Sequence, residues 1–231
     1  MEGIDVYYDG TNIANNCGND IKGFTTNISF LKASGINDYE KFILDSLKYT
    51  KGRPISFQLY DDNDDDIYNT ASKISSYNPS SIFVKVPVIK STGDYNTNII
   101  KELHDDGIKV NVTAIFTKNQ INTLTYCFGK ENDVIISIFG GRINDSGVDC
   151  SDIVKYAVDT FKDYPNVKIL WAACRTIYNM FEAKNQGSHI VTVPESVLSR
   201  MNRIGDELET ASLNTVKQFR QDGLNGNINF I

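Results

Sequence analysis

Short apolar runs alternate with longer amphipathic stretches along most of the chain. The runs are rich in Val, Ile, Phe and Tyr, and most of them contain at most one charged residue, which is typical of buried strands. They predict eight strands: Ile4–Tyr8, Gly23–Asn27, Ile55–Tyr60, Ile82–Val88, Lys109–Ile115, Val134–Phe139, Val167–Ala172 and His189–Val193.

The stretches between these strands have helical spacing. In Asp38–Thr50, for example, Tyr39, Phe42, Ile43 and Leu47 fall on one face of a helix. The same spacing predicts further helices at Asp65–Tyr77, Tyr95–Asp105, Thr117–Gly129, Asp149–Tyr164, Thr176–Gln186 and Glu195–Asn202.

Strands that alternate with helices predict βα units and a parallel sheet, and eight is the number of strands that closes a TIM (β/α)8 barrel. The main rival is an open, doubly wound sheet, which would require a Gly-rich fingerprint after its first strand. The segment Asp9–Ile13 at that place contains no G-x-G-x-x-G. We therefore expect an α/β fold with a single barrel domain over residues 1–231. An extra C-terminal helix at about 205–223 could pack on a neighbouring subunit.

Charge and cysteine content narrow the class of partner. The 231 residues carry a formal net charge of −6 and no basic tail, which argues against nucleic acid as the main partner. The chain has two histidines, and its four cysteines form no C-x-x-C pair, so the spacing indicates no metal site. The residues concerned are His104, His189, Cys17, Cys127, Cys150 and Cys174.

The N-terminal residues contain acids and no apolar core, unlike a signal peptide, and no run approaches the ~18 apolar residues of a membrane span. We therefore expect a cytoplasmic protein that does not bind membranes.

Polar residues recur at the ends of the apolar strands. In a closed barrel, alternate residues point inward and the active site lies at the C-terminal mouth, so these side chains could converge on one pocket. The set is Asp9, Thr25, Asn27, Gln58, Lys85, Asn111, Thr113 and Ser137.

Lys85 is the most informative member of this set. It lies in Ile82–Val88, a run too apolar for a solvated strand edge. A buried ammonium is costly, so we expect the pKa of Lys85 to fall below its usual value of ~10.4. A neutral amine in a dry pocket can attack a ketone to form an imine. The structural alternatives are a lysine that snorkels from a strand end and an ion pair with Asp9.

Four motifs, in order along the chain, resemble those of the transaldolase family. Gly23–Ser29 is similar to G-V-T-T-N-P-S, and Val84–Pro87 is similar to V-K-[IV]-P, which contains the imine-forming lysine. Asn111–Thr117 is similar to N-x-T-L-[IV]-F-S, and Ser137–Ile143 to S-P-F-V-G-R-[IL]. The resemblance covers nearly the whole chain, and its specificity comes from the number and order of the motifs.

The resemblance implies a role for each matching residue. Lys85 would form the imine with the ketose, and Asp9 would take or return the C4 hydroxyl proton during carbon–carbon cleavage. The imine acts as the electron sink, so no cofactor is expected. Gln58 and Thr113 would order a catalytic water.

The remaining matches would bind the substrate. Asn111 and Ser137 would hold the dihydroxyacetone hydroxyls, and Arg142 and Arg175 would clamp the sugar phosphate, because guanidinium groups suit phosphate oxygens. Thr25, Asn27 and Phe139 complete the expected set of substrate-binding residues. Purely structural roles stay open: Asn27, Asn111 and Thr113 could satisfy buried backbone groups, and Arg142 could pair with Asp145.

Departures from the family pattern bear on the reaction. Transaldolases of the family usually have Glu at the place of Gln58, whereas the fructose-6-phosphate aldolases have Gln there. Those aldolases tend to have Tyr at the place of Phe139 and lack the residues found here at 111, 137 and 175. Ala173 replaces a serine expected at the phosphate, which would loosen that site. Ile28 replaces a proline, which we expect to change only the stiffness of the loop.

We therefore predict a transaldolase of the pentose phosphate pathway, which transfers a dihydroxyacetone unit between a ketose phosphate and an aldose phosphate. The alternatives are a lyase that releases dihydroxyacetone and a non-catalytic relative that binds sugar phosphates. Small members of the family resemble homo-oligomers, so the resemblance also implies an oligomer.

Four other features have structural interpretations. The acidic run Asp61–Asp66 lacks the Gly and Glu of a calcium loop, so we expect it to stabilise a helix N-terminus. Cys174 would lie near the mouth without a histidine to activate it. We expect His104 to be a solvated helical residue and Trp171 to lie in the core.

Overall fold

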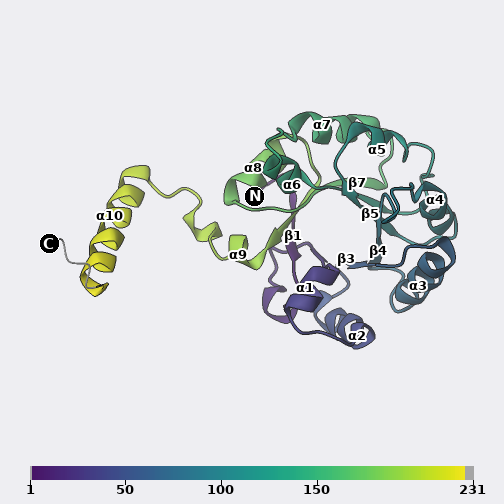
Figure 1. Cartoon of the computed structure of the whole chain (residues 1–231), viewed down its shortest axis with the longest axis horizontal. Helices are drawn as coiled ribbons and strands as arrows, with labels where there is room; N and C mark the ends of the chain where they lie inside the picture. The colour runs from purple at the N-terminus through teal and green to yellow at the C-terminus, as the bar shows by residue number, and fades with distance from the viewer. Residues whose placement is uncertain (1, 227–231) are drawn as a thin grey trace. The chain divides into compact units, whose positions relative to one another are not determined.

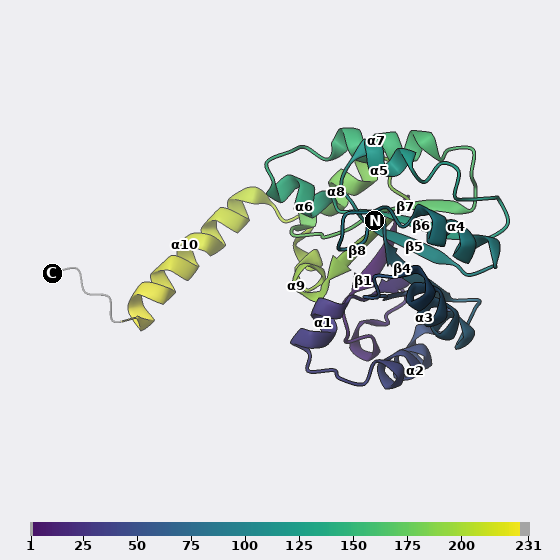
Figure 2. The same ribbon diagram turned by 45° about the vertical axis from the view of Figure 1, so that its right-hand side comes forward.

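The computed structural model describes residues 2–226 and contains a closed barrel of eight parallel strands, hydrogen-bonded in sequence order, with β8 pairing with β1. Helices follow the strands and ring the barrel (Figures 1 and 2). The predicted TIM barrel is therefore confirmed. The strands are β1 Asp5–Asp9, β2 Gly23–Thr25, β3 Ile55–Gln58, β4 Ile82–Pro87, β5 Val110–Ile115, β6 Val134–Ile138, β7 Val167–Trp171 and β8 Ile190–Pro194.

Helices that the spacing predicts are found close to their expected bounds. They are α2 Tyr39–Thr50, α3 Asp64–Ser76, α4 Thr97–Asp105, α7 Ser151–Thr160, α8 Ile177–Asn185 and α10 Leu208–Asn225. Helix α3 shows why such segments fold as they do. Asn63 caps its first turn, which contains Asp64–Asp66, so the carboxylates interact favourably with the helix dipole. Its apolar face, with Ile67 and Ala71, is buried, and α3 contacts β4.

Several short elements differ from the prediction. Strand β2 ends at Thr25, because Asn27 caps a helix that the spacing does not predict, α1 Ile28–Ala33. Helix α6 Gly140–Asp145 is also additional. The predicted helix Thr117–Gly129 shortens to α5 Lys118–Asn122, and the predicted Glu195–Asn202 divides into α9 Glu195–Leu198 and the 3-10 turn η2 Met201–Arg203. A further 3-10 turn, η1, spans Ala14–Asn16. Helices of one or two turns are too short for an apolar periodicity to reveal.

The interior of the barrel has an apolar level. Tyr7, Phe83, Ile135, Leu170 and Ile190, each from a different strand, form one buried cluster that also includes Ala172. Alternate residues of a barrel strand face inward, so the residues two positions further along occupy the next level toward the C-terminal mouth. That level carries the polar side chains of Asp9, Lys85, Ser137 and Thr192. The apolar level therefore forms the floor beneath it.

His104 is a correction to the sequence analysis. Its side chain is 2% exposed rather than solvated. Its Nε2 atom accepts a hydrogen bond from the backbone N–H of Gly129 at 3.0 Å, and its ring packs edge-on against Phe128. Burial lowers the pKa of His104. The loop after α5 covers this residue, which the pattern of α4 alone does not reveal.

Residues from Ser199 onward form a unit separate from the compact unit that ends at Leu198. Among the described residues this unit contains η2 and α10, which confirms the extra C-terminal helix. Helix α10 buries none of its described residues, and its apolar side chains are exposed: Leu208, Leu213, Val216, Phe219 and Leu224. A single domain for the whole chain stays a prediction.

Candidate active site

A pocket of about 380 Å³ opens at the C-terminal ends of the strands. Eight of the eleven predicted site residues line it: Asp9, Asn27, Gln58, Lys85, Thr113, Phe139, Arg142 and Arg175. The other three, Thr25, Asn111 and Ser137, are buried beside it. Residues distant in sequence therefore meet at one place because each ends a neighbouring strand or begins the loop that follows it.

Lys85 lies within β4 between Val84 and Val86, and its side chain is 4% exposed. Its Nζ atom is 3.5 Å from the carbonyl oxygen of Thr26 and 5.9 Å from the centroid of the Phe139 ring. Desolvation lowers the pKa of Lys85 and the charge of Arg142 lowers it further, while the carboxylate of Asp9 opposes this. The site thus shifts Lys85 toward the neutral amine, in the direction that the sequence analysis expects.

Asp9, the last residue of β1, shares the pocket with Lys85. Thr25 donates a hydrogen bond from Oγ1 to Oδ1 of Asp9 at 2.7 Å. Burial raises the pKa of Asp9, and the charge of Lys85 and the hydrogen bond from Thr25 lower it. The two groups interact electrostatically, but no direct ion pair joins them among the described residues.

A chain of three buried side chains lies beside the pocket. Ser137 donates to Oδ1 of Asn111 at 2.7 Å, and Nδ2 of Asn111 lies 2.9 Å from Oγ of Ser56. These side chains come from β6, β5 and β3. Asn111 therefore satisfies side-chain partners rather than the buried backbone groups considered in the sequence analysis. One Nδ2 hydrogen of Asn111 is left beyond this chain.

Thr113 and Gln58 lie on β5 and β3. The hydroxyl of Thr113 is buried and has no hydrogen-bond partner among the described residues. The next residue, Ala114, has a positive φ of 59°, at an irregularity in the pairing of β5 with β6. A buried hydroxyl without a partner and a strained backbone both occur more often at functional sites than elsewhere.

Asn27 has the structural role that the sequence analysis left open. It is the N-cap of α1, and its side chain accepts a hydrogen bond from the backbone N–H of Phe30 at 2.9 Å. The residue still lines the pocket. The helix thereby holds the amide of Asn27 at the edge of the mouth.

Two arginines reach the pocket from neighbouring loops. Arg142 is on α6, with its guanidinium 5.3 Å from the Phe139 ring centroid, and Arg175 follows β7. The alternative of an Arg142–Asp145 pair is wrong, because Asp145 pairs with Arg175 at 3.2 Å. Both members of that pair are more than half exposed, so the pair contributes little stability.

The backbone between these arginines is tightly packed. Ala173 has a positive φ of 63°. A Cβ atom on Gly141 would lie 1.7 Å from the carbonyl oxygen of Ala173, and one on Gly140 would meet the ring of Trp171. Two glycines therefore let α6 begin directly against the loop after β7, which sets Arg142 and Arg175 at one mouth.

The sequence profile of the family described as Transaldolase/Fructose-6-phosphate aldolase matches residues 9–229. The chain belongs to this family. It is 28% identical to a "Probable transaldolase" of Thermoanaerobacter sp. (strain X514), over 88% of this chain and 89% of that relative. A "Probable transaldolase" of Nitrosopumilus maritimus (strain SCM1) is 30% identical, over 78% of each chain.

Two solved structures with similar folds are more distant in sequence than these transaldolase relatives. A crystal structure of KGPDC from Streptococcus mutans superposes with a TM-score of 0.56 at 9% identity, over 88% of this chain and 93% of that one. A second crystal structure of KGPDC from the same organism, solved as a complex, has a TM-score of 0.52 at 10% identity, over 84% and 88% of the two chains. At this identity the likeness shows the barrel fold alone.

Two neighbours of the transaldolase-family residues are missing from the sequence analysis. Thr192 on β8 lines the pocket and contacts Thr25, and Ser56 on β3 contacts Asn111. Both are hydroxyl residues within apolar strands. The signal that selects Lys85, a polar residue in an apolar run, is present in Ile190–Pro194 as well and could have found Thr192.

Cys174 and Trp171 have structural roles in this barrel. The thiol of Cys174 donates to the carbonyl oxygen of Thr176 at 3.2 Å, and burial raises the pKa of Cys174 to about 12. A protonated thiol is a poor nucleophile, which argues against the alternative of cysteine catalysis. Trp171 is fully buried and donates to Gln186 at 3.1 Å, so its expected place in the core is confirmed.

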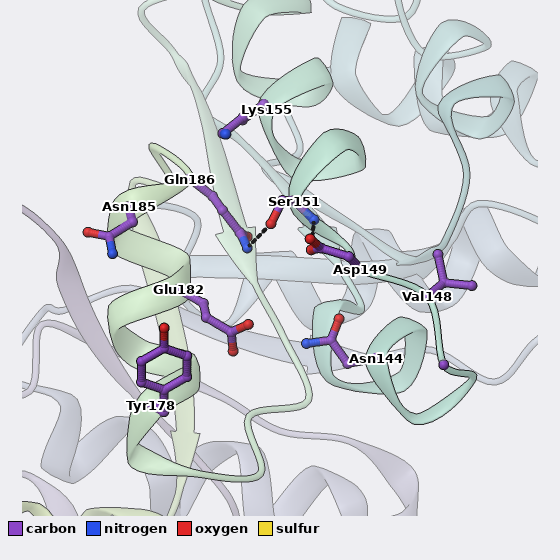
Figure 3. Close-up of a pocket in the computed structure, with 10 residues that line it drawn as sticks. Asn144, Val148, Asp149, Ser151, Lys155, Tyr178, Glu182, Asn185 and Gln186 are labelled. Carbon is purple, nitrogen blue, oxygen red and sulfur yellow. Dashed lines mark hydrogen bonds between the residues drawn. The ribbon is translucent and has the colours of Figure 1, made fainter.

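A second pocket, of about 580 Å³, lies outside the barrel mouth (Figure 3). Residues of α7, α8 and the loop before α7 line it, including Lys155, Tyr178 and Glu182. None of the predicted site residues line it. Its volume exceeds that of the mouth pocket.

Proposed function

We propose that this chain transfers a dihydroxyacetone unit from a ketose phosphate to an aldose phosphate through an imine on Lys85. The observation that carries the proposal is the environment of Lys85. Its amine is buried, its pKa is lowered, and it shares a pocket with a carboxylate whose pKa burial raises. Membership of the transaldolase/fructose-6-phosphate aldolase family supports the same chemistry.

The reaction begins with attack of the neutral Lys85 amine on the C2 carbonyl of the ketose phosphate. Loss of water from the resulting carbinolamine gives the imine, which can accept an electron pair. Asp9 then removes the proton of the C4 hydroxyl. The C3–C4 bond breaks, the aldose phosphate leaves as an aldehyde, and the electron pair remains as an enamine on Lys85.

The second half of the reaction reverses these steps with a different aldehyde. The enamine carbon attacks the carbonyl of the acceptor aldose phosphate, and Asp9 returns its proton to the new alkoxide. Water then hydrolyses the imine and frees Lys85. The buried hydroxyl of Thr113 and the side chain of Gln58 both line the pocket and offer hydrogen bonds to that water. Gln58 cannot exchange a proton as a carboxylic acid does, so it can only orient the water.

Polar groups around the mouth support binding of a sugar phosphate. The free Nδ2 hydrogen of Asn111 and the lone pairs of Ser137 can bind dihydroxyacetone hydroxyls, once Ser137 has donated its own hydrogen to Asn111. Arg142 and Arg175 would bind the phosphate, for which Arg175 would exchange its exposed partner Asp145. Thr25, Asn27 and Phe139 would shape the remainder of the site.

Borohydride reduction in the presence of fructose 6-phosphate tests this proposal. We expect covalent mass from the substrate on the peptide that contains Lys85, measured by mass spectrometry after digestion. A peptide that gains no mass under these conditions would contradict the imine and favour a relative that only binds sugar phosphates.

A lyase is the second candidate, favoured by Gln58 in the pocket lining. Fructose 6-phosphate supplied with and without erythrose 4-phosphate separates the two reactions. Turnover that requires the acceptor supports the transferase, whereas release of dihydroxyacetone without it supports the lyase.

The setting of the reaction is also a proposal. We infer a role in the pentose phosphate pathway and an oligomer of identical chains, with the exposed apolar side chains of α10 as a candidate contact. No helix among residues 2–226 is long and apolar enough to cross a membrane. Size-exclusion chromatography with light scattering measures the oligomeric state. A monomer at micromolar concentration would contradict the expected assembly.

A further inference from the structure

Thr192 is the polar residue in the middle of the apolar strand β8. Its side chain is 2% exposed, and it lines the mouth pocket. Strand β8 pairs with β1 in a register that sets Thr192 beside Tyr7 and Pro194 beside Asp9. Thr192 therefore lies on the strand next to that of Asp9.

The side chain of Thr192 reaches past β1 to a residue of β2. Its hydroxyl oxygen is 2.5 Å from that of Thr25, and Thr25 donates to Asp9 at 2.7 Å. Two hydroxyls from strands on either side of β1 are thus linked in series to the carboxylate that ends β1.

Hydrogen counting assigns the direction of this series. A threonine hydroxyl has a single hydrogen, and Thr25 gives its hydrogen to Asp9. The hydrogen between the two threonines must then come from Thr192. Ionised Asp9 accepts from Thr25, and Thr25 accepts from Thr192. Hydroxyls joined in this way polarise one another, so the donor at the end of the series strengthens the hydrogen bond at its start.

We propose that Thr192 is a positioning residue that acts through Thr25 to hold Asp9 ionised and correctly oriented for removal of the C4 hydroxyl proton. This inference rests on the proposed function, because it assigns a purpose to the base of that reaction. A purely structural role would instead be to satisfy two buried hydroxyls and join β8 to β2.

The electrostatic surroundings of Asp9 set the sign of the expected effect. The titratable groups that interact with it are Lys85 on β4, Tyr8 on β1 and Cys174 after β7. Arg142 and Arg175 also line the pocket that Asp9 shares. Burial raises the pKa of Asp9, whereas donation from Thr25 lowers it. Loss of the Thr192 donor weakens that donation, so the pKa of Asp9 should rise and activity at low pH should fall.

Thr192→Val tests this inference, because valine keeps the branched shape and removes the hydroxyl. We expect the variant to form the borohydride-trapped adduct at Lys85 as the unchanged protein does, since imine formation does not require Asp9. The acid limb of its kcat/KM profile should move to higher pH, with about a fivefold loss on that limb, which corresponds to one hydrogen bond. Thr192→Ser should restore the profile.

Thr50→Val is the matched control. Thr50 is equally buried and donates to Leu47 at the end of α2, away from the pocket. Its removal should lower the melting temperature without moving the pH profile. The inference is overturned if the pH profile of Thr192→Val overlays that of the unchanged protein, or if the profile of Thr50→Val shifts as much. Either result leaves the proposed function intact. Absence of the adduct in the unchanged protein would contradict the proposed function itself, which distinguishes the two failures.

Discussion

Two levels of the barrel interior are built by the same strands and differ in what they contribute. Tyr7, Phe83 and Ile190 belong to the apolar level, and the residues two positions further along their strands are Asp9, Lys85 and Thr192. The apolar level stabilises the fold because its side chains are removed from water. The polar level destabilises it through desolvation, which raises the pKa of Asp9 and lowers that of Lys85.

On the same strand, a residue that stabilises the fold and a residue proposed for the chemistry therefore lie only two positions apart. Three residues that line the mouth pocket also have unfavourable local features: Thr113 lacks a hydrogen-bond partner among the described residues, and Ala114 and Ala173 have positive φ angles. The apolar floor compensates for that cost. Substitutions at the polar level should therefore reduce activity, whereas substitutions at the apolar level should reduce the stability of the fold.

Lys85→Met should have the largest effect. It removes the amine and keeps much of the side-chain volume, so activity should fall more than about 1,000-fold, as for the loss of a covalent nucleophile. The fold should be at least as stable as before, because a desolvated amine is replaced by an apolar group. Turnover assays and urea unfolding measure the two properties. A variant that keeps about a tenth of its activity would show that the chemistry lies elsewhere.

Asp9→Asn should reduce kcat about 100- to 10,000-fold, the range for loss of a general acid–base group. Imine formation at Lys85 should persist, and borohydride trapping should still add mass. Stopped-flow or single-turnover kinetics separate the two steps. If trapping disappears together with cleavage, Asp9 serves imine formation or folding rather than proton transfer at C4.

Phe83→Ala probes the apolar level directly beneath Lys85. Phe83 is buried in the interior cluster, so its truncation should lower the free energy of unfolding by about 3–5 kcal/mol. The kcat per folded molecule should change far less than in Lys85→Met. Urea unfolding with active-site titration provides both numbers. If Phe83→Ala had normal stability but lost its activity, the apolar level would serve the chemistry rather than the stability of the fold, which would contradict the comparison.

The smallest effect concerns a buried polar group outside the barrel. Burial lowers the pKa of His104, whose neutral Nε2 accepts from Gly129. The contribution of His104 to the free energy of unfolding is therefore complete above its pKa in the unfolded chain, about 6.5. It is lost as the pH falls through the lower pKa of the folded state. The unchanged protein should lose ~1 kcal/mol more stability across that range than His104→Gln, whose amide can accept without titration. His189 is present in both proteins, so an equal loss in the two would show that His104 contributes nothing.

The order of strands and helices follows from the sequence because the signal is local. Each strand is an apolar run such as Ile82–Pro87, and each long helix has a repeating apolar face, as in α2. Short elements are different. Helix α1 depends on the cap supplied by Asn27, and α6 depends on the close approach of Gly141 to Ala173. These are contacts between segments, which periodicity does not encode.

The residues of the candidate site, like the strands and helices, could be predicted only in part from the sequence. Lys85 and Asp9 are visible as charged residues within or at the end of apolar runs, and the resemblance to the family adds Arg142 and Arg175. The partners of these residues are not visible. The Ser56–Asn111 contact spans 55 positions, and the Thr25–Thr192 contact spans 167. Closure of the barrel creates both.

The sequence by itself determined which segments become strands and which polar side chains those strands carry, because burial and alternation act over a few residues. The tertiary structure decided which of those side chains meet, which lose their water, and so which change their pKa. Desolvation and hydrogen bonding depend on everything that surrounds a group, and for Lys85 those surroundings come from strands and loops across the barrel.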